Sequence, residues 1–411
     1  MLACVLLGGG ASAHAAVDTF VPRADSDVVE TLRVRPLERA DLEFRQLRAQ
    51  WRTRPNDPVV AGAVASRAIE LARRDGDPRY LGHAEAALAP WWSDSAAPVE
   101  LRLVKATILQ NVHRFDDALL ELDAVLAARP ADAQAWLTRA SILQVQGRLV
   151  DAAASCSRLR ELGTEPYATA CLAELGSLSA RVAPSSVPAA APAPVAAANA
   201  SPATDAAARA RAYTSRDQLA QLSTRPAGRD AASDAWLQLM FAELSERLGD
   251  APAAERAFRL ALAGHPDAYT KGAFADFLLD RHRAPEVVTL LAGEERNDAL
   301  LLRLAIARAE VGAPEAARDT AALAARFAAA RRRGDSVHRR EEARFELQLR
   351  QRPALGLSLA LANWNVQKEP ADARLLLEAA RAAGESAAAE PVRRFLAEHH
   401  PYDVRLPAAR P

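Results

Sequence analysis

The chain has 411 residues, enough for more than one packed unit, and half of them are hydrophobic. Its 52 lysines and arginines balance 52 aspartates and glutamates, so the formal net charge is zero. A protein that binds nucleic acid by general electrostatic attraction needs a basic excess, so this composition argues against that class. The abundance of alanine and leucine favours helices throughout the chain.

The N-terminus resembles an export signal. Residues 2–10 are apolar and glycine-rich, and the following residues 11–15 offer small side chains at the spacing of a cleavage site. We expect residues 1–15 to be a signal peptide with a short n-region, because no lysine or arginine precedes Arg23, and a start codon assigned too far downstream would explain that. The prediction is a periplasmic or secreted protein. A lipoprotein attached through Cys4 is the alternative, although little apolar sequence precedes that cysteine.

Helical periodicity begins after an extended lead at 16–38 and continues through a first block at 39–181. Within that block, helices are expected near 37–51, 59–74, 79–90 and 167–181, and four further helices occupy 99–166. Residues 182–204 are rich in proline and alanine, which disfavours both helix and core, and predict a linker. A second helical block follows at 205–400, and 401–411 form a tail.

Two stretches in the first block superimpose without a gap at a spacing of 34 residues. Residues 99–132 align with 133–166, so that Ala106 falls on Ala140 and Ala118 on Ala152. A fixed period of this size predicts an all-α solenoid of antiparallel helix hairpins, in which each unit buries its apolar face against its neighbours. The same internal offsets recur in the second block at 235–268 and 298–333.

This pattern resembles the tetratricopeptide repeat (TPR). The family's small residues at the eighth and twentieth places are matched by four alanines in the first block and by Ala242, Ala254, Ala305 and Ala317 in the second. A glycine stands in the turn between the two helices at Gly147, Gly249 and Gly312, where a positive φ costs least, and His113 replaces it in the first unit.

The resemblance also implies a concave groove, lined by the second, fifth, ninth and twelfth places of each first helix. Family members that grip a peptide carboxylate place lysine or asparagine there, whereas this chain has Leu103 and Thr107, so such a clamp is not expected. Ordinary solvated surface is the alternative to a peptide groove. The candidate groove residues are Glu100, Leu103, Thr107, Gln110, Gln134, Leu137, Ser141 and Gln144.

Cys156 and Cys171 are the two cysteines that remain after the predicted cleavage. They lie at similar distances on either side of the turn at 163–166, so antiparallel helices would bring them level. In an oxidising compartment this arrangement favours a disulfide, with two buried free thiols as the alternative.

Little else in the sequence points to chemistry. The histidines are scattered, no metal-binding spacing occurs, and neither a phosphate-binding loop nor a nucleophile elbow is found in the predicted mature chain. We therefore expect no catalytic residues, no metal and no cofactor. Trp91-Trp92 ends a helix and is interpreted as a plug between hairpins, with an exposed docking patch as the alternative.

Repeat scaffolds of this kind bind proteins and rarely catalyse. The sequence favours a non-catalytic interaction scaffold or assembly factor of the bacterial envelope, with a protein or peptide partner, no nucleic acid and no required membrane contact. A fixed structural subunit of a secretion or polysaccharide-export complex is the first alternative, and an enzyme with an unrecognised site is the second.

Overall fold

The structure is a computed structural model that describes residues 24, 26–28, 39–182, 202–224, 229–335 and 337–406. The predicted signal peptide lies outside these residues, as do most of the lead and of the linker. The helices up to the predicted linker are α1 (Arg39–Thr53), α2 (Pro58–Asp75), α3 (Arg79–Leu88), η1 (Ala89–Trp91), α4 (Val99–Asn111), α5 (Phe115–Ala128), α6 (Ala133–Val145), α7 (Leu149–Glu161) and α8 (Tyr167–Leu178). Those that follow are α9 (Pro202–Thr224), α10 (Ala231–Arg247), α11 (Ala251–Gly264), α12 (Ala268–Leu279), α13 (Ala284–Leu290), α14 (Asp298–Glu310), α15 (Ala316–Arg332), α16 (Arg339–Gln348), α17 (Pro353–Trp364), α18 (Pro370–Ala382), η2 (Ser386–Ala389) and α19 (Glu390–His399).

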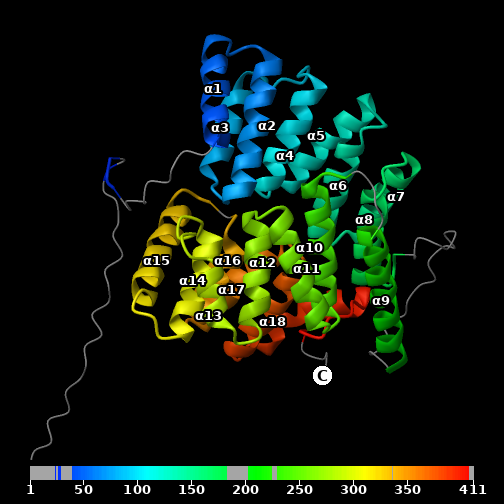
Figure 1. Ribbon diagram of the computed structural model, residues 1–411, viewed down its shortest axis with the longest axis vertical. Coiled ribbons are helices and arrows are strands. Elements are labelled where there is room, and N and C mark those ends of the chain that lie inside the picture. The colour runs from blue at the N-terminus through cyan, green and yellow to red at the C-terminus, as the bar shows by residue number, and fades with distance from the viewer. Residues whose placement is uncertain are drawn as a thin grey trace, which may run out of the picture.

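Consecutive helices pack as hairpins, and the hairpins stack side by side (Figure 1). The pairs are α2–α3, α4–α5, α6–α7, α8–α9, α10–α11, α12–α13, α14–α15 and α16–α17. The predicted all-α solenoid of helix hairpins is therefore confirmed, and within the described ranges no residue belongs to a strand.

The turns between paired helices need a backbone conformation that glycine adopts without strain. Gly147, Gly249 and Gly312 have φ of 76°, 81° and 68°, as predicted for the turn position. His113 takes the same left-handed conformation with φ 58°. Gly76, which the repeat comparison did not single out, ends α2 with φ 61°.

Small residues lie where the two helices of a hairpin cross. Ala106 and Ala118, and likewise Ala140 and Ala152, are at most 1% exposed, which matches the predicted positions. The prediction that Ala317 lies at such a crossing is wrong, because Ala317 is exposed on α15. The reason is a longer turn: α15 begins at the nineteenth place of its unit, whereas α5, α7 and α11 begin at the seventeenth.

The stack continues across the predicted linker. α8 and α9 flank that linker and pack against each other as one hairpin, and α10 contacts both. The crossing is close, since a Cβ at Gly176 would lie 3.5 Å from the Ser215 hydroxyl. α9 begins inside the range predicted as linker, at Pro202. The division of the chain into two blocks remains a prediction, and the helices on either side of the linker share a core.

The second half of the chain returns beneath the first. In Figure 1, α1 to α6 form the upper part, α10 to α18 form the lower part, and α7 to α9 lie at the side where the stack turns. We call the contacts between residues 75–182 and residues 297–400 the seam. At one point of the seam, the backbone N–H of Lys368 donates to the Val145 carbonyl at 2.7 Å.

Candidate interaction surfaces

The eight predicted groove residues lie on α4 and α6. Glu100 and Gln134 are exposed, and the other six are partly buried. The hydroxyls of Thr107 and Ser141 donate at 3.0 Å to carbonyls of their own helices, so neither is held ready for a ligand. Leu103 packs against the core beneath α4. Peptide binding on this face remains a prediction.

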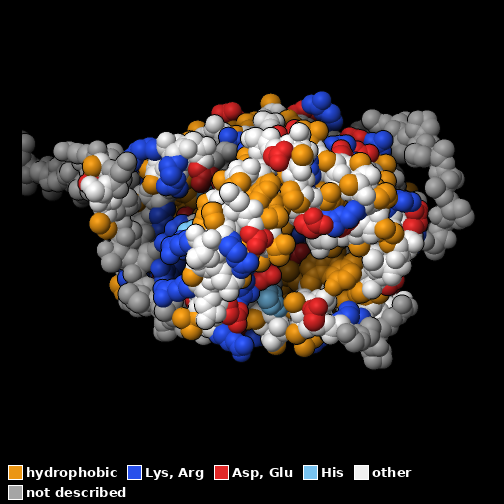
Figure 2. All heavy atoms as spheres, turned by 90° about the horizontal axis from the view of Figure 1, so that it is seen from above, with side chains coloured by type: hydrophobic (Ala, Val, Ile, Leu, Met, Phe, Trp, Pro, Cys, Tyr) orange, Lys and Arg blue, Asp and Glu red, His pale blue; other side chains and the backbone are white. Residues whose placement is uncertain are grey.

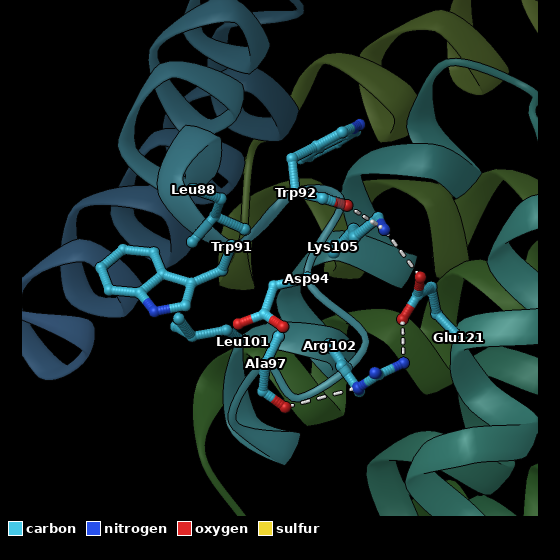
Figure 3. Close-up of a pocket in the computed structure, with 9 residues that line it drawn as sticks. All are labelled: Leu88, Trp91, Trp92, Asp94, Ala97, Leu101, Arg102, Lys105 and Glu121. Atoms are coloured by element: carbon cyan, nitrogen blue, oxygen red, sulfur yellow. Dashed lines mark hydrogen bonds and ion pairs between the residues drawn. The ribbon is translucent and has the colours of Figure 1, made fainter. Parts of the chain in front are cut away.

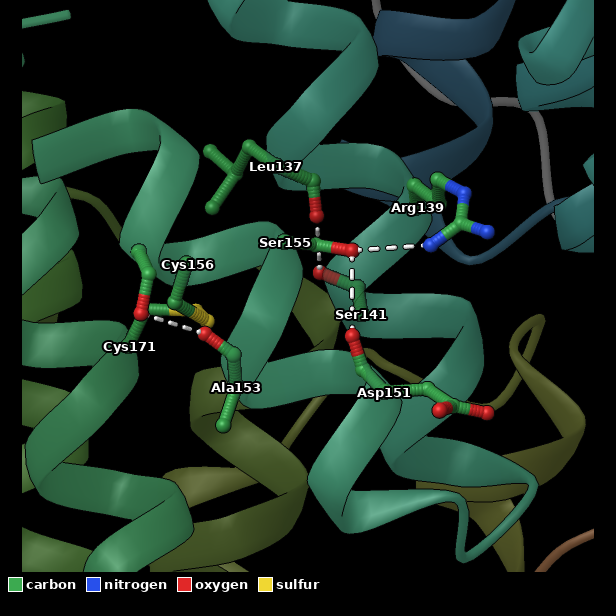
Figure 4. The surroundings of a disulfide bond; sticks show 9 residues. Leu137, Arg139, Ser141, Asp151, Ala153, Ser155, Cys156 and Cys171 are labelled. Carbon is green, nitrogen blue, oxygen red and sulfur yellow. Dashed lines mark hydrogen bonds between the residues drawn. A yellow bond between two sulfur atoms is a disulfide. The ribbon is translucent and has the colours of Figure 1, made fainter. Parts of the chain in front are cut away.

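The predicted cysteine pair joins α7 to α8 (Figure 4). The structure joins Cys156 and Cys171 as a disulfide, with Cα atoms 5.9 Å apart and a sequence separation of 15. Both side chains are buried in the core of the first half. The Cα separation lies within the usual range for a disulfide, and the presence of the bridge in the exported protein remains a prediction.

Trp91 and Trp92 lie at the joint between α3 and α4, beside a small pocket (Figure 3). Trp92 packs against the cores on both sides of that joint. Glu121 closes the pocket by accepting from Arg102 at 3.0 Å and from Lys105 at 2.7 Å. With about 10 Å³ of free space, room for little more than one water, the pocket serves as packing rather than as a binding site.

An open groove of about 510 Å³ is lined by residues of α5, α6 and α7. Trp136 supplies most of its aromatic surface, and the Arg158 guanidinium lies 5.8 Å from the ring centroid. Its cations already have partners, because Arg139 donates to Ser155 at 3.0 Å and pairs with Asp123 at 3.3 Å. The groove therefore offers no uncompensated charge to a ligand.

A different arrangement occurs where α8, α10, α12, α14, α16 and α18 converge. We call this region, with the charged residues named below, the inner surface. Tyr269, at the start of α12, is 58% exposed, and its hydroxyl donates to Glu243 Oε1 at 2.9 Å. Glu243, on α10, makes no ion pair within 4 Å among the residues described. Burial raises the pKa of the Glu243 carboxyl to about 7, and the negative charge of Glu174 adds to that effect.

Four neighbouring carboxylates of this inner surface, Glu174, Asp276, Glu369 and Asp372, are paired with arginines. Arg247 holds Glu174 through two hydrogen bonds of 2.9 and 2.7 Å. Burial acts to raise the pKa of Asp276, but Arg303 at 2.6 Å and Arg344 at 2.5 Å outweigh it and lower that pKa to about 2.

Six carboxylates and four arginines of the inner surface act on one another, and Lys368 lies close to one of these carboxylates, Asp372. The hydrogen-bond partner of Glu243 is the neutral hydroxyl of Tyr269. The charged set comprises Glu174, Glu243, Asp276, Glu341, Glu369, Asp372, Arg247, Arg303, Arg340 and Arg344. Seen from above, the molecule is hollowed, and hydrophobic side chains form the visible floor of the hollow (Figure 2).

Sequence reasoning missed the inner surface although the signal was present. Counting from Ala235, Glu243 occupies the ninth place of its unit, one of the four predicted groove places. Aligning Ala275 with Ala242 puts Tyr269 at the second place and Asp276 at the ninth. The same rule that selected α4 and α6 therefore selects these residues when it is applied to the second half.

Two further observations concern the described part of the chain. It contains no group of three or more His, Cys, Asp or Glu side chains placed to hold a metal ion. None of its helices combines the length and the apolar character that crossing a membrane requires.

Comparison with known proteins gives little more. No protein-family model matches the chain, and no curated protein matches it. Among solved structures it is similar to the one titled "Crystal Structure of P58(IPK) TPR Domain at 2.5 A", with 13% identity over 84% of this chain and 99% of that chain, and a TM-score of 0.19. A TM-score this low supports no transfer of function.

Proposed function

We propose that this protein is a TPR-like, non-catalytic scaffold that holds a segment of another protein against its inner surface. The observation that carries the proposal is the pair formed by Tyr269 and Glu243. Tyr269, 58% exposed, lies beside a carboxylate without a cation, on a surface where Glu174, Asp276, Glu369 and Asp372 each form an ion pair with an arginine.

The chemistry of this pair favours a partner segment with an arginine or lysine. A guanidinium or ammonium group would supply the missing positive charge at Glu243, and the ring of Tyr269 would add a cation–π contact. A cation stabilises the charged form of the carboxylate, so binding would release the proton that Glu243 holds near neutral pH. Affinity for the basic segment should therefore fall as the pH drops below about 7.

Photo-crosslinking in the producing cell tests this function. The variant Tyr269→p-benzoylphenylalanine should crosslink to a defined partner through a segment containing arginine or lysine. Leu260, 57% exposed on α11, is the matched position away from the inner surface and should give no such product. Adding Glu243→Gln should lower the yield, while Glu85→Gln, at an exposed position of α3, should not. Equal crosslinking from both positions would contradict the proposal.

The setting we propose is the bacterial envelope, where the predicted export signal would place the protein as an assembly factor. A fixed subunit of a secretion or polysaccharide-export complex is the second candidate. The first predicts a free, monodisperse protein whose partner exchanges, and the second predicts co-purification at constant stoichiometry. Fractionation of cells followed by size-exclusion chromatography separates these outcomes and tests export directly.

A further inference from the structure

The seam joins helical units that are far apart in sequence, and it uses the turn ends of the early hairpins. Besides its backbone bond to Val145, Lys368 donates through Nζ to the Gln146 carbonyl at 3.3 Å. Phe395 of α19 packs against the cores of both halves. At the other end of the seam, the Ala180 N–H donates to the His399 carbonyl at 2.7 Å.

His113 lies at the turn between α4 and α5, and the charged groups that act on it belong to the second half. Its ring stacks on Phe115 with the centroids 5.3 Å apart. Burial lowers the pKa of His113 to about 4, and the positive charge of Arg340 on α16 acts in the same direction. His338 also lowers it, whereas the carboxylates of Glu341 and Asp372 oppose the shift.

His399 lies at the opposite end of the seam and is 5% exposed. Its Nδ1 lies 2.9 Å from the Ser179 hydroxyl, and its ring centroid is 4.4 Å from that of Phe395. Burial lowers the pKa of His399, with Arg181 and His400 acting in the same direction and Glu398 opposing them. Both histidines are thus held neutral in positions where the two halves meet.

We propose that the seam is a proton-sensitive closure, which His113 and His399 hold shut when neutral and which opens when they take up protons. The closed state binds fewer protons than a state in which these rings reach water. Its stability is therefore complete above pH 6.5 and falls as the pH drops from 6.5 towards 4. This inference concerns access to the inner surface and does not depend on which partner binds there.

The size of the effect follows from His113 alone. If opening returns its pKa from about 4 to 6.5, the closed-to-open equilibrium constant at pH 5 falls about 30-fold relative to pH 8. Any contribution from His399 multiplies this factor. Hydrogen bonds across the seam should then exchange faster, while hydrogen bonds inside one hairpin should not.

Hydrogen exchange of the full chain tests the closure. The backbone amides of Ala180 and Lys368 donate across the seam, whereas that of Phe258 lies within α11 and serves as the internal reference. After correction for the intrinsic effect of pH, exchange at the first two amides should rise at least 30-fold between pH 8 and pH 5. Exchange at Phe258 should not change. Seam amides that stay equally protected at pH 5 would overturn the inference.

Substitutions distinguish protonation of the two histidines from general effects of acid on the protein. Asparagine tolerates a left-handed backbone and cannot take up a proton, so His113→Asn with His399→Asn should abolish the pH response. The single variant His113→Asn should reduce it about 30-fold, which keeps the test valid if the double variant does not fold. His282→Asn is the matched control, because His282 has φ 56° in a comparable turn but is 88% exposed. Opening that persists in the double variant would refute the proposal.

Discussion

Gly76 offers the sharpest test of how the two halves are fitted together. A Cβ added at this residue would lie 1.8 Å from Asn297 Nδ2, so Asn297 would have to move. Asn297 donates from Nδ2 to the Asp75 carbonyl at 3.2 Å, and its Oδ1 accepts from two amides at the start of α14. The variant Gly76→Ala therefore disturbs the turn, the seam and a helix cap together.

The expected loss can be summed from these parts. An alanine with φ 61° costs about 1 kcal/mol relative to glycine. The lost hydrogen bond to Asp75 costs about 1 kcal/mol, and the disturbed cap of α14 about 1 kcal/mol more. We expect Gly76→Ala to lower the free energy of unfolding by about 3 kcal/mol.

Gly312 is the matched control, because its φ is 68° and a Cβ there would meet nothing within 4 Å. Gly312→Ala should cost only the backbone strain, about 1 kcal/mol. Urea unfolding followed by circular dichroism and tryptophan fluorescence measures both losses. In an Asn297→Ala background, Gly76→Ala should also cost only about 1 kcal/mol. Equal losses for the two glycine variants would refute the assigned role of Asn297.

Three further predictions address the core and the charges. Intact-mass analysis of the exported protein should show Cys156 and Cys171 resistant to alkylation until they are reduced, and reduction should cost up to about 3 kcal/mol. Arg247→Ala should lower the free energy of unfolding by about 3–5 kcal/mol, because the Glu174 carboxylate, only 14% exposed, would lose the cation that pairs with it. Ala140→Leu should cost about 1–3 kcal/mol by overpacking the crossing of α6 with α7.

Each of these predictions has a control outcome that would contradict it. Two free thiols in the exported protein would exclude the bridge. Arg158→Ala breaks a pair whose side chains are 47% and 58% exposed and should change stability by less than about 1 kcal/mol, so an equal loss at both arginines would count against the burial argument. Ala317→Leu, on an exposed face, should be nearly neutral; a similar cost for both leucines would show that crowding at the crossing is not the cause.

The sequence predicted what is local to a repeat and missed what joins distant repeats. The alanines at helix crossings and the turn glycines recur at fixed offsets, because each unit packs its two helices closely and reverses the chain in the same way. The offset failed at Ala317, where a longer turn shifted the second helix. α9 carried no repeat signature, so the pairing of α8 with α9 across the linker could not be anticipated.

The candidate site shows the same division between local and distant information. The groove rule, once applied to every unit, selects Glu243 and Asp276 from the sequence alone. It cannot tell which selected residues are compensated, because their partners come from other helices: Arg344, which pairs with Asp276, is 68 residues away. Only the folded structure shows that Glu243 is left with a tyrosine as its partner.

The turn ends of the early hairpins illustrate why function on this scaffold need not reside in the groove. Within a unit, Gly76, His113 and Gly147 have the same task, which is to reverse the chain with a positive φ. At the seam the three positions differ. The missing side chain of Gly76 leaves room for Asn297, and that of Gly147 leaves room for Lys368 and Phe395. His113 instead places a titratable ring near the positive charge of Arg340. Glycine at position 113 would satisfy the repeat equally well. A histidine in its place therefore changes the closure and leaves the hairpin intact, so His113→Asn should alter the pH at which the seam opens without altering the exchange of amides inside α4 and α5.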